Sequence, residues 1–160
     1  MPQSSFRIVS LVALASAFAA GDASSCPRLV EREAVARFLH ELAAHALVVE
    51  YMTASKNGEA ERASSLIDYE EWAKEMRMNE ERAKAWAQNH RKSLAEAYRQ
   101  HKAEGSTKVF GLVRATVLDE TAVFEVTQER VGGVLLWEIK LKFKEGRWVI
   151  VGFRTLRWRQ

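Results

Sequence analysis

The stretch FKEGRWVIVGF, residues 143–153, predicts a tight turn followed by a strand. Glu145 and Gly146 are a turn signal, so we expect the strands on either side to pair antiparallel across Lys144-Glu145-Gly146. The residues from Trp148 to Phe153 are apolar on both faces of the strand. Such a strand lies between two neighbours or contains a bulge, and Gly152 is where we expect a bulge.

In the segment before this turn, Leu135, Trp137, Ile139, Leu141 and Phe143 alternate with Leu136, Glu138, Lys140 and Lys142, which is typical of a half-buried strand. Burial of each large side chain on its apolar face contributes roughly 1.5–3 kcal/mol, and no strand can bury that face alone. The same period of two begins at Thr107 and continues to the end of the chain. The expected strands are Lys108–Leu118, Ala122–Gln128, Leu135–Phe143 and Arg147–Leu156, with turns at 119–121, 131–133 and 144–146.

Helical periodicity fills the chain before Thr107. We expect helices at Arg28–Ala54, Glu59–Ile67 and Tyr69–Ala103, the last with a break near Met78-Asn79, where Asn79 can cap the helix after the break. We expect no strand among them. The first helix has an apolar stripe typical of a core-facing helix, formed by Val35, Phe38, Leu39, Leu42, Ala46 and Val49. The third region has a second stripe, formed by Trp72, Met76, Asn79, Ala83, Trp86, His90, Leu94, Tyr98 and His101.

These elements together predict an α+β fold with its helices segregated from its strands. The N-terminal helices would pack on one face of a curved four-stranded antiparallel sheet, and the family resemblance described below implies that they form a cone-like α+β roll. The apolar residues of the third strand would face the helices.

The first twenty residues have the pattern of a signal peptide. Arg7 precedes an uncharged apolar run, and Ala17-Phe18-Ala19 fits the small-x-small cleavage rule. We therefore expect a signal peptide at 1–20, a leader at 21–28, a single domain at 29–160, and a periplasmic or secreted mature chain without a stable membrane span. A retained N-terminal anchor is the alternative.

Cys26 is the only cysteine, so no internal disulfide can form. Because Cys26 lies shortly after the signal sequence, lipidation of its thiol is an alternative. The residues before it, however, lack the aliphatic side chain of a lipobox. A free cysteine is favoured over a lipoprotein anchored through Cys26.

The formal net charge is +3, too small to indicate a nucleic-acid partner. The sheet half is the basic half, with 10 basic and 6 acidic residues from 106 to 160. Lys140, Lys142 and Lys144 would form a comb of cations on the outer sheet face. A solvated face that discourages edge pairing is favoured over a site for an anionic partner.

The closing strand resembles the last strand of the nuclear transport factor 2-like (cystatin-like) superfamily, and most of all its secreted bacterial members of unknown function. The matching positions are Gly146, Arg147, Trp148, Ile150, Gly152 and Phe153. The resemblance covers about Val30 to Leu156. It implies a cone that holds small apolar ligands in isomerases and dehydratases of the SnoaL and ketosteroid isomerase type, and that serves elsewhere as a binding or assembly surface.

The side chains expected at or near the cone interior are Tyr51, Asp68, Trp72, His90, Tyr98 and Trp137. Asp68 is interpreted first as the N-cap of the next helix. His90 should have a lowered pKa if apolar groups surround it. Glu41 and His45 supply only two metal ligands, so we expect no metal site. No spacing among these residues enforces acid–base geometry, so we name no catalytic residue and expect no cofactor.

The sequence therefore favours an exported, non-catalytic binding or interaction domain whose partner is a small apolar ligand or a protein. An isomerase or dehydratase that uses the cone remains an alternative, and it would need two polar groups converging in a closed cavity. A periplasmic lipid carrier is the second alternative, and it would need a large apolar cavity. Two copies of the chain could also pair through their sheets to form a homodimer.

Overall fold

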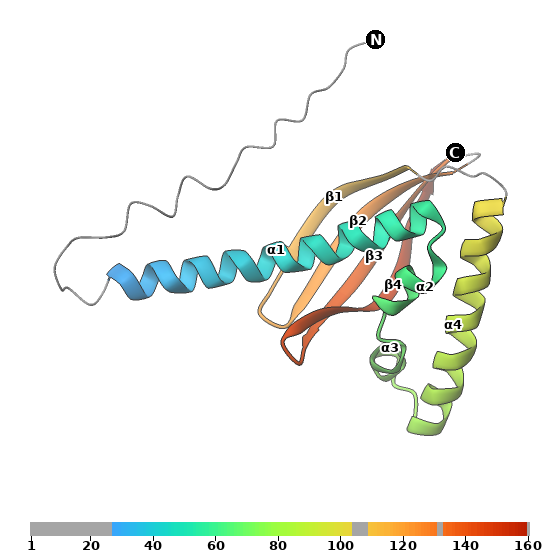
Figure 1. Cartoon of the computed structure of the whole chain (residues 1–160), viewed down its shortest axis with the longest axis horizontal. Helices are drawn as coiled ribbons and strands as arrows, with labels where there is room; N and C mark the ends of the chain where they lie inside the picture. Colours follow the sequence, from blue (N-terminus) through green and yellow to red (C-terminus); the bar gives the residue numbers. More distant parts are fainter. Residues whose placement is uncertain (1–26, 104–108, 131–132, 160) are drawn as a thin grey trace, which may run out of the picture. The chain divides into compact units, whose positions relative to one another are not determined.

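A computed structural model describes residues 27–103, 109–130 and 133–159, so the signal sequence and Cys26 lie outside the described residues. The chain divides into two compact units, residues 1–35 and 36–160, and the second unit contains the sheet. Four helices precede four strands, which confirms the α+β class (Figure 1). The elements are α1 (Pro27–Asn57), α2 (Ala60–Ser65), α3 (Tyr69–Glu75), α4 (Glu80–Ala103), β1 (Val109–Val117), β2 (Thr121–Arg130), β3 (Gly133–Lys144) and β4 (Arg147–Arg159).

The sheet is an antiparallel meander in the order β1-β2-β3-β4. The predicted hairpin between β3 and β4 is confirmed, because Lys144 pairs with Arg147 across Glu145 and Gly146. Both turn residues have positive φ, 54° and 80°, as the left-handed loop requires. β4 is longer than predicted and continues past Leu156 to Arg159.

Residues 148–152 of β4 are buried on both faces. The sequence offered two alternative reasons, a neighbour on each side or a bulge at Gly152, and the bulge lies one residue earlier, at Val151. Lys140 pairs with Gly152 and Leu141 pairs with Ile150, so Val151 has no partner and forms a bulge. On the other side of β4, Ile67 makes a parallel bridge to Ile150. The N–H of Asp68 donates to the carbonyl of Ile150 at 2.9 Å. This bridge is a strand-like contact among the helices, where the sequence predicted none.

The predicted break in the third helical region separates α3 from α4. α3 ends at Glu75, and the Asn79 side chain accepts the N–H of Arg82 at 3.0 Å, which caps α4 as expected. Asp68 caps α3 in the same way, accepting the N–H of Glu71 at 2.9 Å. Both short polar side chains replace a backbone partner that a first helical turn lacks.

The predicted core-facing stripe of α1 is wrong in direction. Its five large members are more than half exposed, from 52% at Leu42 to 57% at Val35, and Ala46 is also exposed. The residues that pack are Ala44, Val48, Tyr51 and Ala54, each at most 2% exposed. At about 100° per residue, these two sets lie on opposite sides of the helix. The periodicity correctly indicated an apolar face, but α1 has two such faces. The face that packs contains Ala44 and Ala54, whose small side chains let the helix approach the core closely.

The inner face of α1 lies against the sheet (Figure 1). His45 meets the ring of Phe124 on β2 at 4.9 Å, and His40 meets Phe143 on β3 at 4.5 Å. The indole N–H of Trp148 donates to the carbonyl of His40 at 3.0 Å. The sheet face that carries the apolar residues of β3 is therefore the face that α1 covers.

The three lysines of β3, Lys140, Lys142 and Lys144, form ion pairs and are not a purely solvated face. Lys142 pairs with Glu71 at 2.7 Å, Lys144 pairs with Asp68 at 3.1 Å, and Lys140 pairs with Glu75. The three carboxylates come from α3 and its cap. Steps of three and four residues along a helix rise about 5 Å, close to the roughly 6.6 Å between alternate residues of a strand, so the two rows match.

Candidate functional site

Aromatic rings from α1, β3 and β4 meet between α1 and the sheet. Tyr51 on α1 stacks on Phe153 of β4, with ring centroids 5.1 Å apart. Trp137 on β3 lies 6.2 Å from Tyr51 and 5.4 Å from Phe153. Two of the predicted lining residues therefore meet here, and Phe153 joins them. The name aromatic interior is used below for the rings of Tyr51, Trp72, Trp86, His90, Tyr98, Trp137 and Phe153.

Tyr51 and Tyr98 bring α1 and α4 together through a hydrogen bond between their hydroxyl groups. Both side chains are buried, at 2% and 5% exposed. Burial raises the pKa of Tyr98 to about 12, although hydrogen bonds from Tyr51 and Ser55 partly offset it. Burial also raises the pKa of Tyr51 well above its usual value, and the neighbouring Tyr98 adds to the rise. Both hydroxyls are therefore protonated at neutral pH, and neither is poised to act as a base.

His90 on α4 is enclosed by indole rings. It stacks on Trp86 at 4.6 Å and meets Trp72 of α3 edge-on at 4.9 Å. Desolvation by these rings lowers the pKa of His90, so the imidazole is neutral at neutral pH. Trp72 also meets Phe153 at 5.3 Å. Gly152 makes room for Trp72, since a Cβ on that glycine would lie 3.3 Å from its indole nitrogen.

Trp137 contributes a polar atom that is not satisfied. Its indole nitrogen is buried and makes no hydrogen bond to any residue that the structure describes. A buried donor without a partner costs about 1–3 kcal/mol. The aromatic interior therefore includes one donor that a ligand carbonyl or a water could use.

Asp68 is the predicted lining residue that the structure places elsewhere. Burial alone would raise the pKa of Asp68, but the N–H of Glu71 and the ammonium of Lys144 bring it below its usual value. The carboxylate is thus held ionised as a cap and ion-pair partner. The other five predicted residues, Tyr51, Trp72, His90, Tyr98 and Trp137, are linked by ring contacts and the tyrosine pair.

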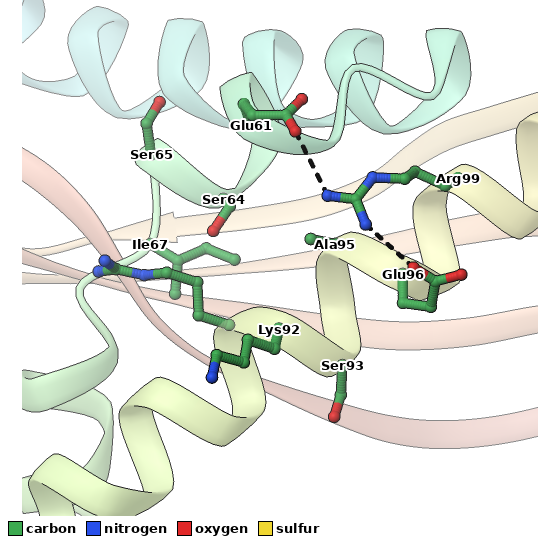
Figure 2. Close-up of a pocket in the computed structure, with 10 residues that line it drawn as sticks. Glu61, Ser64, Ser65, Ile67, Lys92, Ser93, Ala95, Glu96 and Arg99 are labelled. Atoms are coloured by element: carbon green, nitrogen blue, oxygen red, sulfur yellow. Dashed lines mark hydrogen bonds and ion pairs between the residues drawn. The ribbon is translucent and has the colours of Figure 1, made fainter.

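An open groove of about 900 Å³ lies between α2 and α4 (Figure 2). Arg99 spans it, pairing with Glu61 at 3.5 Å and with Glu96 at 2.9 Å. Sequence patterns did not predict this groove, because its residues have no motif and meet only when α2 packs on α4. Its lining residues are Glu61, Ser64, Ser65, Ile67, Arg91, Lys92, Ser93, Ala95, Glu96 and Arg99.

The outward face of α1 is a second exposed surface, in addition to the groove. We call Phe38, Leu39, Leu42, Ala46 and Val49 the outer stripe. Its four large side chains are 52–56% exposed. Leu39, Leu42, Ala46 and Val49 follow one another at steps of three and four residues, and Phe38 lies four residues before Leu42, so the outer stripe is one continuous apolar band along the helix. Val35 continues the spacing by one further step and is 57% exposed.

No helix among the described residues is both long and apolar enough to span a bilayer. No group of three or more histidine, cysteine, aspartate or glutamate side chains among them is arranged to hold a metal ion.

Comparisons with known proteins connect the chain to one fold. No family model matches the sequence, and no curated protein matches it. Among solved structures, it is similar to an NTF-2-like protein of unknown function from Silicibacter pomeroyi DSS-3, with a TM-score of 0.53 and 14% identity. The match covers 75% of this chain and 98% of that chain. The resemblance predicted from the closing strand is thus confirmed at the level of structure, and the chain has the nuclear transport factor 2-like fold.

Proposed function

We propose that this chain is an exported, non-catalytic interaction domain that binds a protein partner through the outer stripe of α1. The observation that carries the proposal is the exposure of Phe38, Leu39, Leu42 and Val49, each more than half accessible on one helix face. Single exposed apolar residues are common on protein surfaces, whereas a contiguous exposed apolar patch often marks an interaction site.

The energetics favour a covered stripe. Full burial of a large apolar side chain contributes roughly 1.5–3 kcal/mol, and about half of that remains to be gained at each of the four large positions. The inner face of α1 already packs on the sheet through Ala44 and Val48. The outer stripe is therefore not needed to hold the domain together, and its apolar residues are available to a partner.

The state of the aromatic interior supports binding over catalysis. An isomerase of the ketosteroid type needs a carboxylate beside a buried donor. The carboxylate predicted for that role, Asp68, is engaged by Lys144 and by the N-terminus of α3. A lipid carrier needs a large apolar cavity, whereas Tyr51, Trp137 and Phe153 contact one another through their rings where the cone would offer one. These two alternatives have less support than an interaction surface.

Export rests on the sequence pattern of Arg7, the apolar run and Ala17-Phe18-Ala19. Intact-mass analysis of the chain released by a bacterial host should give a species that begins near Ala20. A mass that retains Met1 would contradict export by cleavage. A diacylglycerol adduct on Cys26 would make the chain a lipoprotein instead.

Carbene labelling in living cells tests whether the stripe is covered. Cells that produce the chain are labelled, and modification of Leu42 is compared with that of Val113, which is 57% exposed on β1. We expect strong protection of Leu42 in the cell relative to dilute purified protein, with Val113 labelled equally in both. Equal labelling of Leu42 in both samples would contradict the proposed function.

The groove between α2 and α4 supports a second candidate function, the binding of a small acidic ligand. Arg91 and Lys92 are exposed in the groove and make no ion pair with a described residue, and Arg91 lies 5.2 Å from the Tyr69 ring. NMR titration with inorganic phosphate and with acetate should shift the groove signals. The double substitution Arg91→Gln with Lys92→Gln should remove those shifts, and shifts that persist in it would exclude this groove.

A further inference from the structure

The partner that best fits the outer stripe is a second copy of the chain. We infer that two α1 helices pack antiparallel through their outer stripes, with Leu42 of each copy on the two-fold axis. This inference rests on the proposed function, because it names the protein that the surface binds. A two-fold interface uses the same patch on both copies, so the patch must complement itself.

The stripe complements itself in size when it is reversed about Leu42. Phe38 then lies beside the partner's Ala46, and the partner's Phe38 lies beside Ala46. Large side chains thus meet small ones on both sides of the axis, which is how helices interdigitate at close range. A parallel pair would set Phe38 against Phe38 and Ala46 against Ala46, which leaves a bulge at one end and a gap at the other.

A lipid surface fits the stripe less well. Between residues 31 and 50 the helix has two arginines and four glutamates. Helices that lie on anionic membranes instead have lysine and arginine along their polar flanks. The mixed, slightly acidic flanks suit a protein that has the same mixture.

The available area indicates a weak dimer. Exposed fractions of 52–57% on the large residues from Val35 to Val49 correspond to roughly 450 Å² of apolar surface per copy, or about 900 Å² for the pair. Flanking polar residues bring this toward the lower end of the standard range of about 1,200–2,000 Å². We therefore expect a Kd on the order of micromolar and a population that changes with concentration.

Sedimentation velocity from low to high micromolar concentration tests the inference on the full mature chain. We expect a monomer–dimer equilibrium in which Leu42→Lys raises Kd at least about tenfold. Val113→Lys is the matched control, since Val113 is as exposed as the stripe but lies on the outer strand β1. It should leave Kd unchanged. Loss of the dimer in Val113→Lys alone would overturn the inference in favour of pairing through the sheet.

Single-cysteine cross-linking tests the direction in a Cys26→Ser background. Leu42→Cys should form a disulfide-linked dimer, because the two copies meet at that position. Val49→Cys should not, because the two Val49 positions of an antiparallel pair lie about 21 Å apart along the axis. Cross-linking at both positions would mean a parallel pair and would overturn the arrangement.

The inference and the proposed function fail in different ways. A chain that stays monomeric at every concentration, with Leu42 still protected in cells, overturns self-association and leaves the interaction surface intact. Flotation with anionic phosphatidylglycerol vesicles that is lost in Leu42→Lys would overturn both in favour of a membrane surface. If Leu42 is protected from labelling in cells and is protected equally in purified protein at high concentration, both the proposed function and the self-association are supported.

Discussion

α1 and α4 are the two long helices of this fold, and they bury themselves differently. α4 has one apolar face, formed by Ala83, Ala87 and Tyr98 with Trp86, His90 and Leu94, and its remaining surface is polar. α1 has two apolar faces on opposite sides, of which only the inner one meets the sheet. The comparison shows that when a helix has a single apolar face, the sequence is enough to predict which face packs on the core. A helix with two apolar faces leaves one of them exposed when its own domain covers only the other.

The inner contact of α1 should produce the largest loss when it is broken. Trp148 is 6% exposed, contacts His40 and Phe143, and donates to the α1 backbone. We expect Trp148→Ala to cost about 3–5 kcal/mol in urea unfolding, since it empties a large buried volume. Trp158→Ala is the control, because Trp158 is 43% exposed on the same strand. A cost below about 1 kcal/mol for Trp148→Ala would contradict the inner-face assignment.

The link between the two helices should have the next largest effect. Tyr51→Phe leaves the Tyr98 hydroxyl buried with one partner fewer, so we expect a loss of about 1–3 kcal/mol. Tyr98→Phe should cost a similar amount, and the double variant should cost less than the sum. Additive losses in the double-mutant cycle would show that the two hydroxyls do not interact.

The same pair predicts alkaline sensitivity. The folded pKa of Tyr98, about 12, lies above the unfolded value near 10. The folded state therefore holds its proton longer, and stability is complete below pH 10 and falls as the pH rises toward 12. Urea unfolding between pH 10 and 12 measures how steeply the free energy of unfolding falls with pH. This dependence should be weaker in the double variant that combines Tyr51→Phe and Tyr98→Phe. An unchanged slope would assign the sensitivity to other groups.

His90 should give a smaller effect at the acidic end. Its pKa is lowered in the folded chain, so the unfolded state binds a proton first as the pH falls below ~6.5. Stability from this group is present above that pH and is lost below it. An NMR titration should give a value below ~6.5, and His90→Phe should reduce the slope of stability at acidic pH. A value well above 6.5 would indicate a carboxylate beside the ring and would favour the enzyme alternative.

The outer stripe should give the smallest effect on the stability of the monomer. Leu42→Lys changes a residue that is 52% exposed, so the free energy of unfolding in dilute solution should change by no more than about 0.5 kcal/mol. The matched variant Val48→Lys places a charge on the inner face, where Val48 is 1% exposed, and should unfold the domain. Equal effects of the two variants would remove the distinction between the faces of α1.

Local patterns were enough to predict the strands, the hairpin at Glu145-Gly146 and the caps at Asp68 and Asn79, because each depends on neighbours in the sequence. Five of the seven side chains of the aromatic interior had been named from the sequence as lining candidates, since large rings on a periodic face are usually buried, whereas Trp86 and Phe153 had not. The choice between the faces of α1 was not predictable from period alone. The groove and the lysine–carboxylate rows were missed because they form between segments distant in sequence.

The bridge between Ile67 and Ile150 has a consequence for how the chain folds. The two residues are separated by most of the domain, so the contact can form only after β4 has been made and the segment before α3 has docked on it. Until then the outer edge of β4 presents unpaired N–H and carbonyl groups, which can recruit a strand from another chain. Weakening this contact would thus reduce the yield of refolding through aggregation more than it would reduce the stability of molecules that have already folded.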